Sequence, residues 1–99
     1  MYSIEYAESV TDDLSSLRAF DRATLLDRVE KLLTGEPTRE TRNRKVVVGL
    51  QPQWEHEEPL WQLRIEEFRV FYDVAETEKR VIVRAIRRKP PHKTTEEIL

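Results

Sequence analysis

The chain contains no cysteine and no long hydrophobic run. The lack of cysteine excludes disulfide bonds and thiolate metal ligands, and it is compatible with a reducing cytosol. Nothing approaches the roughly 20 consecutive apolar residues that a membrane-spanning helix needs. The segment Met1–Tyr6 also lacks the basic start and the apolar stretch of a signal peptide. We therefore expect a cytoplasmic protein with no membrane partner.

The length of 99 residues predicts one domain over residues 1–99, with a single modest core. Its net charge of −2 is unevenly distributed. Residues 1–36 contain eight acidic and four basic side chains, whereas residues 79–95 contain seven basic side chains and no acidic one. Screening limits the reach of the distant acidic residues, so this basic segment can bind an acidic partner. The alternative is a set of solvated edge charges that prevent strand aggregation.

The N-terminal third predicts a strand followed by two helices. Apolar and polar residues alternate over residues 2–6, as in a short strand. A first helix would bury Val10, Leu14 and Leu17, with Asp12 and Asp13 facing water.

The second helix is expected between Asp21, as its N-cap, and Gly35, just after its end. Residues 18–20 would connect the two helices. One apolar stripe predicts the face that this helix buries: Leu25, Leu26, Val29, Leu32 and Leu33.

The remaining sequence predicts four β-segments. Residues 45–48 form a first strand, residues 60–65 and 68–74 form two strands joined at Glu66–Glu67, and residues 79–89 form the last. Pro90–Pro91 end the sheet, and Thr94 can cap a short helical turn that reaches Leu99. The order β-α-α-β-β-β predicts an α+β domain in which a helical hairpin packs on one face of a small, mainly antiparallel sheet.

Arg69 is unusual for its position, because it interrupts a run of aromatic and β-branched residues in a strand. A guanidinium held at a fixed angle on a strand suits phosphate binding. The alternative is an ion pair with Asp73 on the same face of the strand.

The element order resembles that of the RelE/ParE superfamily of bacterial toxins. The likeness rests on Ile4–Tyr6, on Leu63–Ile65 before Phe68–Tyr72, and on the basic end of the last strand. It implies a cytoplasmic toxin of a type II toxin–antitoxin system, with a cognate antitoxin as partner. RelE-like members cut mRNA in the ribosomal A site through the RNA's own 2′-hydroxyl group. ParE-like members instead inhibit DNA gyrase without catalysis, and a member that only binds its antitoxin is a third possibility.

The resemblance leans toward an endoribonuclease, an mRNA interferase that uses no cofactor. It implies catalytic roles for Arg69 and Lys89 and a proton-transfer role for His92, with further phosphate contacts from a basic set: Arg64, Arg84, Arg87, Arg88 and Lys93. The alternative for this set is a charged sheet edge.

The sequence departs from RelE at two places. Leu60 and Gln62 stand where RelE has two lysines, and Thr95 stands where RelE has a late tyrosine. A mechanism that uses those groups is therefore incomplete here, which motivates the gyrase alternative.

Other notable residues have structural alternatives. Trp61 is a base-stacking or core residue, and Trp54 is a candidate interface anchor. His56 is a base, an acid or an exposed bystander, and its acidic neighbours match no known metal-ligand spacing, so no metal site is expected. Glu66 and Glu67 are turn residues, with a role as base as the alternative.

Overall fold

The computed structural model describes residues 1–99. The elements are β1 (Ser3–Tyr6), α1 (Glu8–Ser15), α2 (Ala19–Leu33), β2 (Arg44–Val46), β3 (Trp61–Ile65), β4 (Phe68–Ala75), β5 (Arg80–Arg88) and α3 (Thr95–Ile98). The order is thus β-α-α-β-β-β-β with a helical turn at the C-terminus. It confirms the α+β fold and each of the four predicted β-segments, and it contains one strand more than the β-α-α-β-β-β order.

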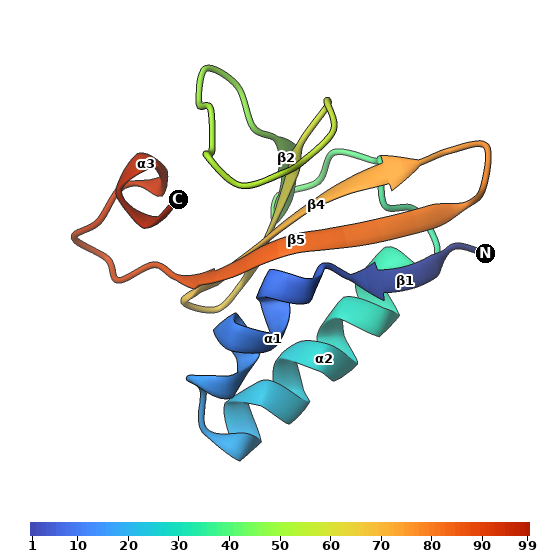
Figure 1. Ribbon diagram of the computed structural model, residues 1–99. Helices are drawn as coiled ribbons and strands as arrows, with labels where there is room; N and C mark the ends of the chain where they lie inside the picture. Colours follow the sequence, from blue (N-terminus) through green and yellow to red (C-terminus); the bar gives the residue numbers. More distant parts are fainter.

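The five strands form one mixed sheet in the order β1-β5-β4-β3-β2. Only the β1–β5 pair is parallel, and every other pair is antiparallel. Figure 1 shows α1 and α2 together on one side of this sheet, and the long β2–β3 connection and α3 on the other. The two faces of the sheet therefore have different covers.

The helix-covered face holds the main core, a cluster of 13 buried hydrophobic residues. It forms because alternate residues of each strand point to the same side. Phe68, Val70 and Tyr72 of β4 thus meet the α2 stripe, in which Leu25, Val29 and Leu33 are buried.

The opposite face, called here the open face, carries a smaller cluster of Leu60, Phe71, Ala85 and Ile98. The β2–β3 connection and α3 cover only part of it, so polar side chains of the same strands remain at its end.

A β-bulge in β5 changes which residues point to the open face. Phe71 pairs with Ala85 and Tyr72 pairs with Val83, so Arg84 is an extra residue opposite β4. Val81 and Val83 point to the helices before the bulge, and Ile86 does so after it. The shift places Arg87 on the open face.

Several local predictions are confirmed. Glu66 and Glu67 form the tight β3–β4 turn, in which Glu66 adopts a φ of 55°. The Thr94 side chain accepts a hydrogen bond from the Glu97 main chain, and the Glu97 carboxylate accepts one from the Thr94 main chain. This reciprocal cap fixes the start of α3.

Other local predictions are wrong. The second helix begins at Ala19 with Arg18 at its N-cap, so Asp21 lies in the first turn, within 3.6 Å of Arg18. The predicted 45–48 strand is shorter and begins earlier, at Arg44. Asp13 does not face water alone, because its carboxylate accepts a hydrogen bond from the Ile86 main chain at 3.0 Å. The α1 helix thereby covers the edge of β5 beyond the end of β1.

No helix of the structure combines the length and the apolar character needed to cross a membrane.

Candidate nucleic-acid interface

Three arginines form a row across the open face. Arg64 of β3 is paired in register with Arg69 of β4, and Arg69 with Arg87 of β5. Like charges directly opposite one another destabilise a sheet. The row is therefore a local cost to folding unless a counter-charge or an anionic ligand offsets it.

A cavity of about 260 Å³ opens beside this row. We call it the cationic pocket, and it is lined by Arg42, Asn43, Lys45, Gln62, Arg64, Arg69, Lys89 and Thr95. Every lining residue is polar, five are cationic and none is acidic. Such a lining matches the charge and the hydrogen-bonding capacity of a phosphate group.

Arg69 is the most deeply placed cation of the pocket. It is 9% exposed, and its Nη1 donates to the carbonyl oxygens of Glu66 at 3.0 Å and Phe68 at 2.9 Å. Burial, and to a smaller extent the charge of Arg64, lower the pKa of the Arg69 guanidinium from its usual value. The expected alternative, an ion pair with Asp73, does not form, because Asp73 binds Arg84 instead. Two carbonyls thus anchor Arg69 without neutralising its charge.

Main-chain hydrogen bonds hold two further pocket residues. The Lys89 nitrogen donates to the Glu67 carbonyl at 2.6 Å, which ties the chain after β5 to the β3–β4 turn. The Arg64 nitrogen donates to the Asn43 carbonyl at 2.7 Å, which brings the segment before β2 to the pocket.

Three further residues of the cationic pocket were not predicted from the sequence: Arg42, Asn43 and Lys45. Lys45 is paired in register with Gln62, one row along the open face from Arg64 and Arg69. The sequence signal for these residues was the concentration of arginines and lysine over residues 39–45. That signal indicates a place in the pocket only once β2 is known to lie next to β3.

Ion pairing separates the pocket cations from the other basic residues. No carboxylate lies within 4.0 Å of the charged nitrogens of the five pocket cations, whereas the remaining predicted phosphate-binding residues each have a carboxylate partner. The predicted set is therefore split into two groups.

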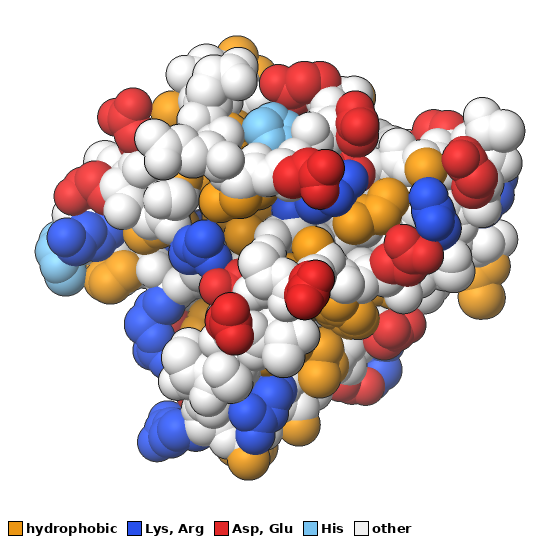
Figure 2. Space-filling view, in the orientation of Figure 1, with side chains coloured by type: hydrophobic (Ala, Val, Ile, Leu, Met, Phe, Trp, Pro, Cys, Tyr) orange, Lys and Arg blue, Asp and Glu red, His pale blue; other side chains and the backbone are white.

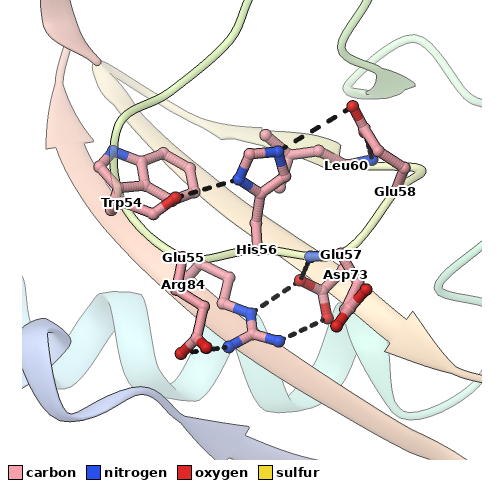
Figure 3. Close-up of polar contacts among 8 residues, drawn as sticks. All are labelled: Trp54, Glu55, His56, Glu57, Glu58, Leu60, Asp73 and Arg84. Carbon is pink, nitrogen blue, oxygen red and sulfur yellow. Dashed lines mark hydrogen bonds and ion pairs between the residues drawn. The ribbon is translucent and has the colours of Figure 1, made fainter.

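Arg84 lies outside the cationic pocket and is paired with Asp73. Its Nε donates to Asp73 Oδ2 at 2.7 Å and its Nη2 to Asp73 Oδ1 at 3.3 Å. The same carboxylate accepts a hydrogen bond from the Glu57 main chain at 2.8 Å. Figure 3 shows how this pair holds the β2–β3 connection against the sheet, with Glu55 on the other side of Arg84.

Arg87 and Arg88 also have partners outside the cationic pocket. Arg87 lies 2.8 Å from Asp13 of α1. Arg88 points to the helix-covered side of the sheet, where it binds Glu67 and lies over the Phe68 ring. Arg87 and Arg88 lie on opposite sides of the sheet because neighbouring residues of a strand point to opposite faces. The bulge decides which of the two points to the open face.

His92 and Lys93 lie in the turn before α3, and neither lines the cationic pocket. His92 is exposed, and Lys93 lies 3.8 Å from Glu97 on the same turn of chain. The structure thus does not bring the predicted proton-transfer histidine to the arginines. Figure 2 shows the Lys and Arg side chains gathered where β5 runs toward α3, and acidic side chains over the β2–β3 connection.

His56 is held within the β2–β3 connection. Its Nδ1 lies 3.1 Å from the Trp54 carbonyl oxygen and its ring contacts the Trp54 ring edge-on, as Figure 3 shows. Trp54 in turn packs against Phe71 on the open face. Neither histidine therefore belongs to the cationic pocket.

Trp61, unlike Trp54, is 5% exposed in the main core, where its ring is stacked on Tyr72.

Comparison with known proteins identifies the fold. No protein-family model and no curated protein matches the sequence. Solved structures do match. The RelBE2 toxin–antitoxin complex of Mycobacterium tuberculosis gives a TM-score of 0.69 at 17% identity, over 89% of this chain and 98% of that one.

Two further structures agree with this result. The archaeal RelE–RelB complex of Pyrococcus horikoshii OT3 gives a TM-score of 0.67 at 19% identity, over 94% of this chain and 98% of that one. The isolated E. coli RelE toxin gives 0.67 at 15% identity, over 98% and 94%. The chain therefore has the fold of the RelE toxins.

Proposed function

We propose that this chain is the toxin of a toxin–antitoxin pair and that it cleaves mRNA on the ribosome. The observation that carries the proposal is the cationic pocket, in which five cations converge with no carboxylate to neutralise them. The RelE-like fold supports the toxin role, since the similar structures are RelE toxins, two of them in complex with an antitoxin.

The proposed reaction uses the RNA itself as nucleophile. A ribose 2′-hydroxyl loses its proton and attacks the adjacent phosphorus, the bond from phosphorus to the 5′ oxygen breaks, and a cyclic phosphate and a 5′-hydroxyl result. Negative charge grows on the phosphoryl oxygens in the transition state, where preorganised cations lower its energy most. Arg69 is placed for this role because its own hydrogen bonds to two carbonyls hold the guanidinium still.

The remaining pocket cations divide into two kinds. Arg42 and Arg64 can bind the flanking phosphates through planar guanidinium groups. Lys45 and Lys89 carry ammonium protons, and one of them can protonate the leaving 5′ oxygen. The pocket has no histidine, tyrosine or carboxylate, so no side chain is assigned as the base. The proton of the 2′-hydroxyl group passes to solvent.

The test is a cleavage assay on translating ribosomes in which the 5′ ends of the mRNA are mapped. We expect new ends with the wild-type protein, none with Arg69→Ala, and unchanged cleavage with Arg88→Ala as the matched control. Intact mRNA at an excess of wild-type toxin, with growth still arrested, would reject the nuclease function.

A second candidate function is inhibition of DNA gyrase without catalysis. It is favoured by the same absence of a general base among the pocket residues, and it would use the cationic pocket only as a binding surface. A supercoiling assay separates the two functions. Lack of any effect on gyrase at micromolar protein removes this alternative.

Either function implies a cognate antitoxin. An acidic, disordered segment that folds on binding could lay carboxylates against the cationic pocket and so supply the missing counter-charges. Co-expression with the neighbouring reading frame should yield a complex that dissociates more readily as the salt concentration rises. Toxin that remains free in that experiment would count against the toxin–antitoxin assignment.

A further inference from the structure

A second cavity of about 190 Å³ adjoins the cationic pocket. We call it the valine cavity, and it is lined by Lys45, Val46, Val47, Val48, Leu50, Gln62 and Thr95. Lys45, Gln62 and Thr95 also line the cationic pocket, so they form the boundary between the two cavities. A polar, positively charged space and a largely apolar space thus lie side by side.

Gln62 is the buried polar group of this boundary. The residue is 5% exposed, and its Oε1 accepts a hydrogen bond from the Thr95 hydroxyl at 3.4 Å. Its Nε2 donates to no protein group and is not sealed from solvent. An amide donor that is open to solvent can exchange water for an acceptor of a ligand. The amide donor is therefore available at the boundary.

The apolar wall of the valine cavity is unusually accessible. Val48 is 83% exposed, although it lies directly after two partly buried valines. Its side chain extends the apolar wall outward beyond the end of β2. A flat ligand with apolar faces and a polar edge could lie against this wall and still reach the amide of Gln62.

We infer that the valine cavity is a nucleobase subsite and that Gln62 reads the edge of the base. The inference rests on the proposed function, because the cationic pocket would hold the phosphate of the same nucleotide. A nucleotide joins an anionic phosphate to a flat base with apolar faces and hydrogen-bonding edges, which is the combination that the two adjoining cavities offer. RNA-binding proteins commonly read unstacked bases in this way, through their edges.

The orientation of the Gln62 amide favours one class of base edge. Its oxygen lies 3.4 Å from the Thr95 hydroxyl, so its N–H donors are the groups left for the ligand. N–H donors favour an edge with two neighbouring acceptors, such as O6 and N7 of guanine, over the corresponding edge of adenine, where N6 is itself a donor. Thr95 is then a positioning residue, which fixes the amide that makes the contact.

The test measures direct binding to short RNAs, independently of cleavage. Four labelled tetranucleotides of sequence A-A-X-A, with X as A, C, G or U, are compared with a fifth that has an abasic site at X. We expect guanine to bind about tenfold more tightly than adenine. Gln62→Leu should bind all four bases alike.

Two variants protect the test from a folding defect. Val48→Ser changes an exposed side chain and should weaken binding of all four bases relative to the abasic RNA. Thr95→Val should reduce the base preference.

The two levels of the proposal fail differently. Equal binding of all five RNAs by the wild type, or a preference that survives Gln62→Leu, overturns the base subsite and leaves the cationic pocket intact. Binding that Arg69→Ala does not weaken overturns the proposed phosphate site, and with it the subsite that depends on it.

Discussion

The cationic pocket and the β5 arginines use the same side-chain chemistry for different purposes. In the pocket, Arg64 and Arg69 lie opposite each other on the neighbouring strands β3 and β4, and neither has a carboxylate partner. On β5, only a few residues away, Arg84, Arg87 and Arg88 are each paired with an acidic side chain. Paired cations stabilise contacts between layers, whereas unpaired cations keep their charge available for a ligand.

A basic segment in a sequence is therefore not by itself evidence of a binding site. Most basic side chains of residues 79–95 form ion pairs within the molecule. Most unpaired cations of the pocket come instead from the segments around β2, β3 and β4. Figure 3 shows a fully paired arginine: Arg84 binds Asp73, and Asp73 also binds the β2–β3 connection. Ion pairing is thus the property expected to separate structural from functional cations.

The largest expected effect follows from breaking the Arg84–Asp73 pair. Asp73→Ala should lower the free energy of unfolding by about 3–5 kcal/mol, because it leaves a largely buried guanidinium without its counter-charge. The measurement is urea denaturation.

The matched control removes both charges of this pair. The double variant Arg84→Met with Asp73→Leu should be much closer to the wild type, since no buried charge is left unpaired. Equal losses in the single and the double variant would show that the ion pair is not what matters at this position.

The second effect separates the pocket from β5 in RNA binding. Arg69→Ala should weaken binding about tenfold at low salt and reduce the slope of log affinity against log salt by about one, since it removes a phosphate contact. Arg88→Ala should change neither quantity. Equal effects of the two substitutions would remove the distinction between paired and unpaired arginines.

Arg69→Ala should also leave folding nearly unchanged. The variant loses the hydrogen bonds to Glu66 and Phe68, but it relieves the repulsion between Arg69 and Arg64. We expect a change within about 1 kcal/mol in urea denaturation. A much larger loss would mean that Arg69 is a structural cation like Arg84.

A third test uses alkaline pH to separate the core from both cationic groups. Burial raises the pKa of Tyr72 above its usual range, opposed in smaller part by the charge of Arg44, and burial with the nearby Glu30 charge raises the pKa of Tyr6 to about 12. The unfolded chain ionises its tyrosines near pH 10. The folded state therefore binds more protons above pH 10, and stability must fall as the pH rises.

Tyr72→Phe provides the control for this titration. It removes the hydrogen bond to the Pro37 carbonyl, 2.6 Å long, and should cost about 1 kcal/mol at neutral pH. The variant should then lose about 1 kcal/mol less than the wild type for each pH unit above 10. Urea midpoints at pH 9, 10 and 11 give the comparison, and parallel profiles would contradict it.

The smallest effect is expected at His92. The imidazole is exposed and outside the cationic pocket, so His92→Ala should change the rate of mRNA cleavage by no more than about twofold. The ribosomal cleavage assay measures this directly. A large loss of activity would restore the role that the resemblance implied for this residue.

Hydrophobic periodicity made most of the fold predictable. Alternation over β1, β3 and β4 and the leucine stripe of α2 follow from local geometry, in which each residue's place in the element decides its face. The helix starts were less predictable, as Asp21 shows. The α2 helix begins three residues earlier, with Arg18 in place of Asp21 at the N-cap, because packing against the sheet favours the longer helix without a side-chain cap.

The candidate site was only partly predictable. Arg69 was visible as a cation in an apolar strand, and Lys89 and Arg64 followed from the resemblance. Arg42 and Lys45 were not assigned, because their distance from Arg69 along the chain gives no indication of proximity. The ion pairs of Arg84 and Arg87 were equally hidden, since their partners Asp73 and Asp13 lie on other elements.

The amino-acid sequence by itself determined the order of the elements, the core face of each and the choice of Arg69 as a candidate. The tertiary structure decided which cations stay unpaired. The reason is physical: the charge that a side chain offers to a ligand depends on the counter-charges around it, and these come from strand register, from the bulge in β5 and from the packing of α1 against the sheet edge.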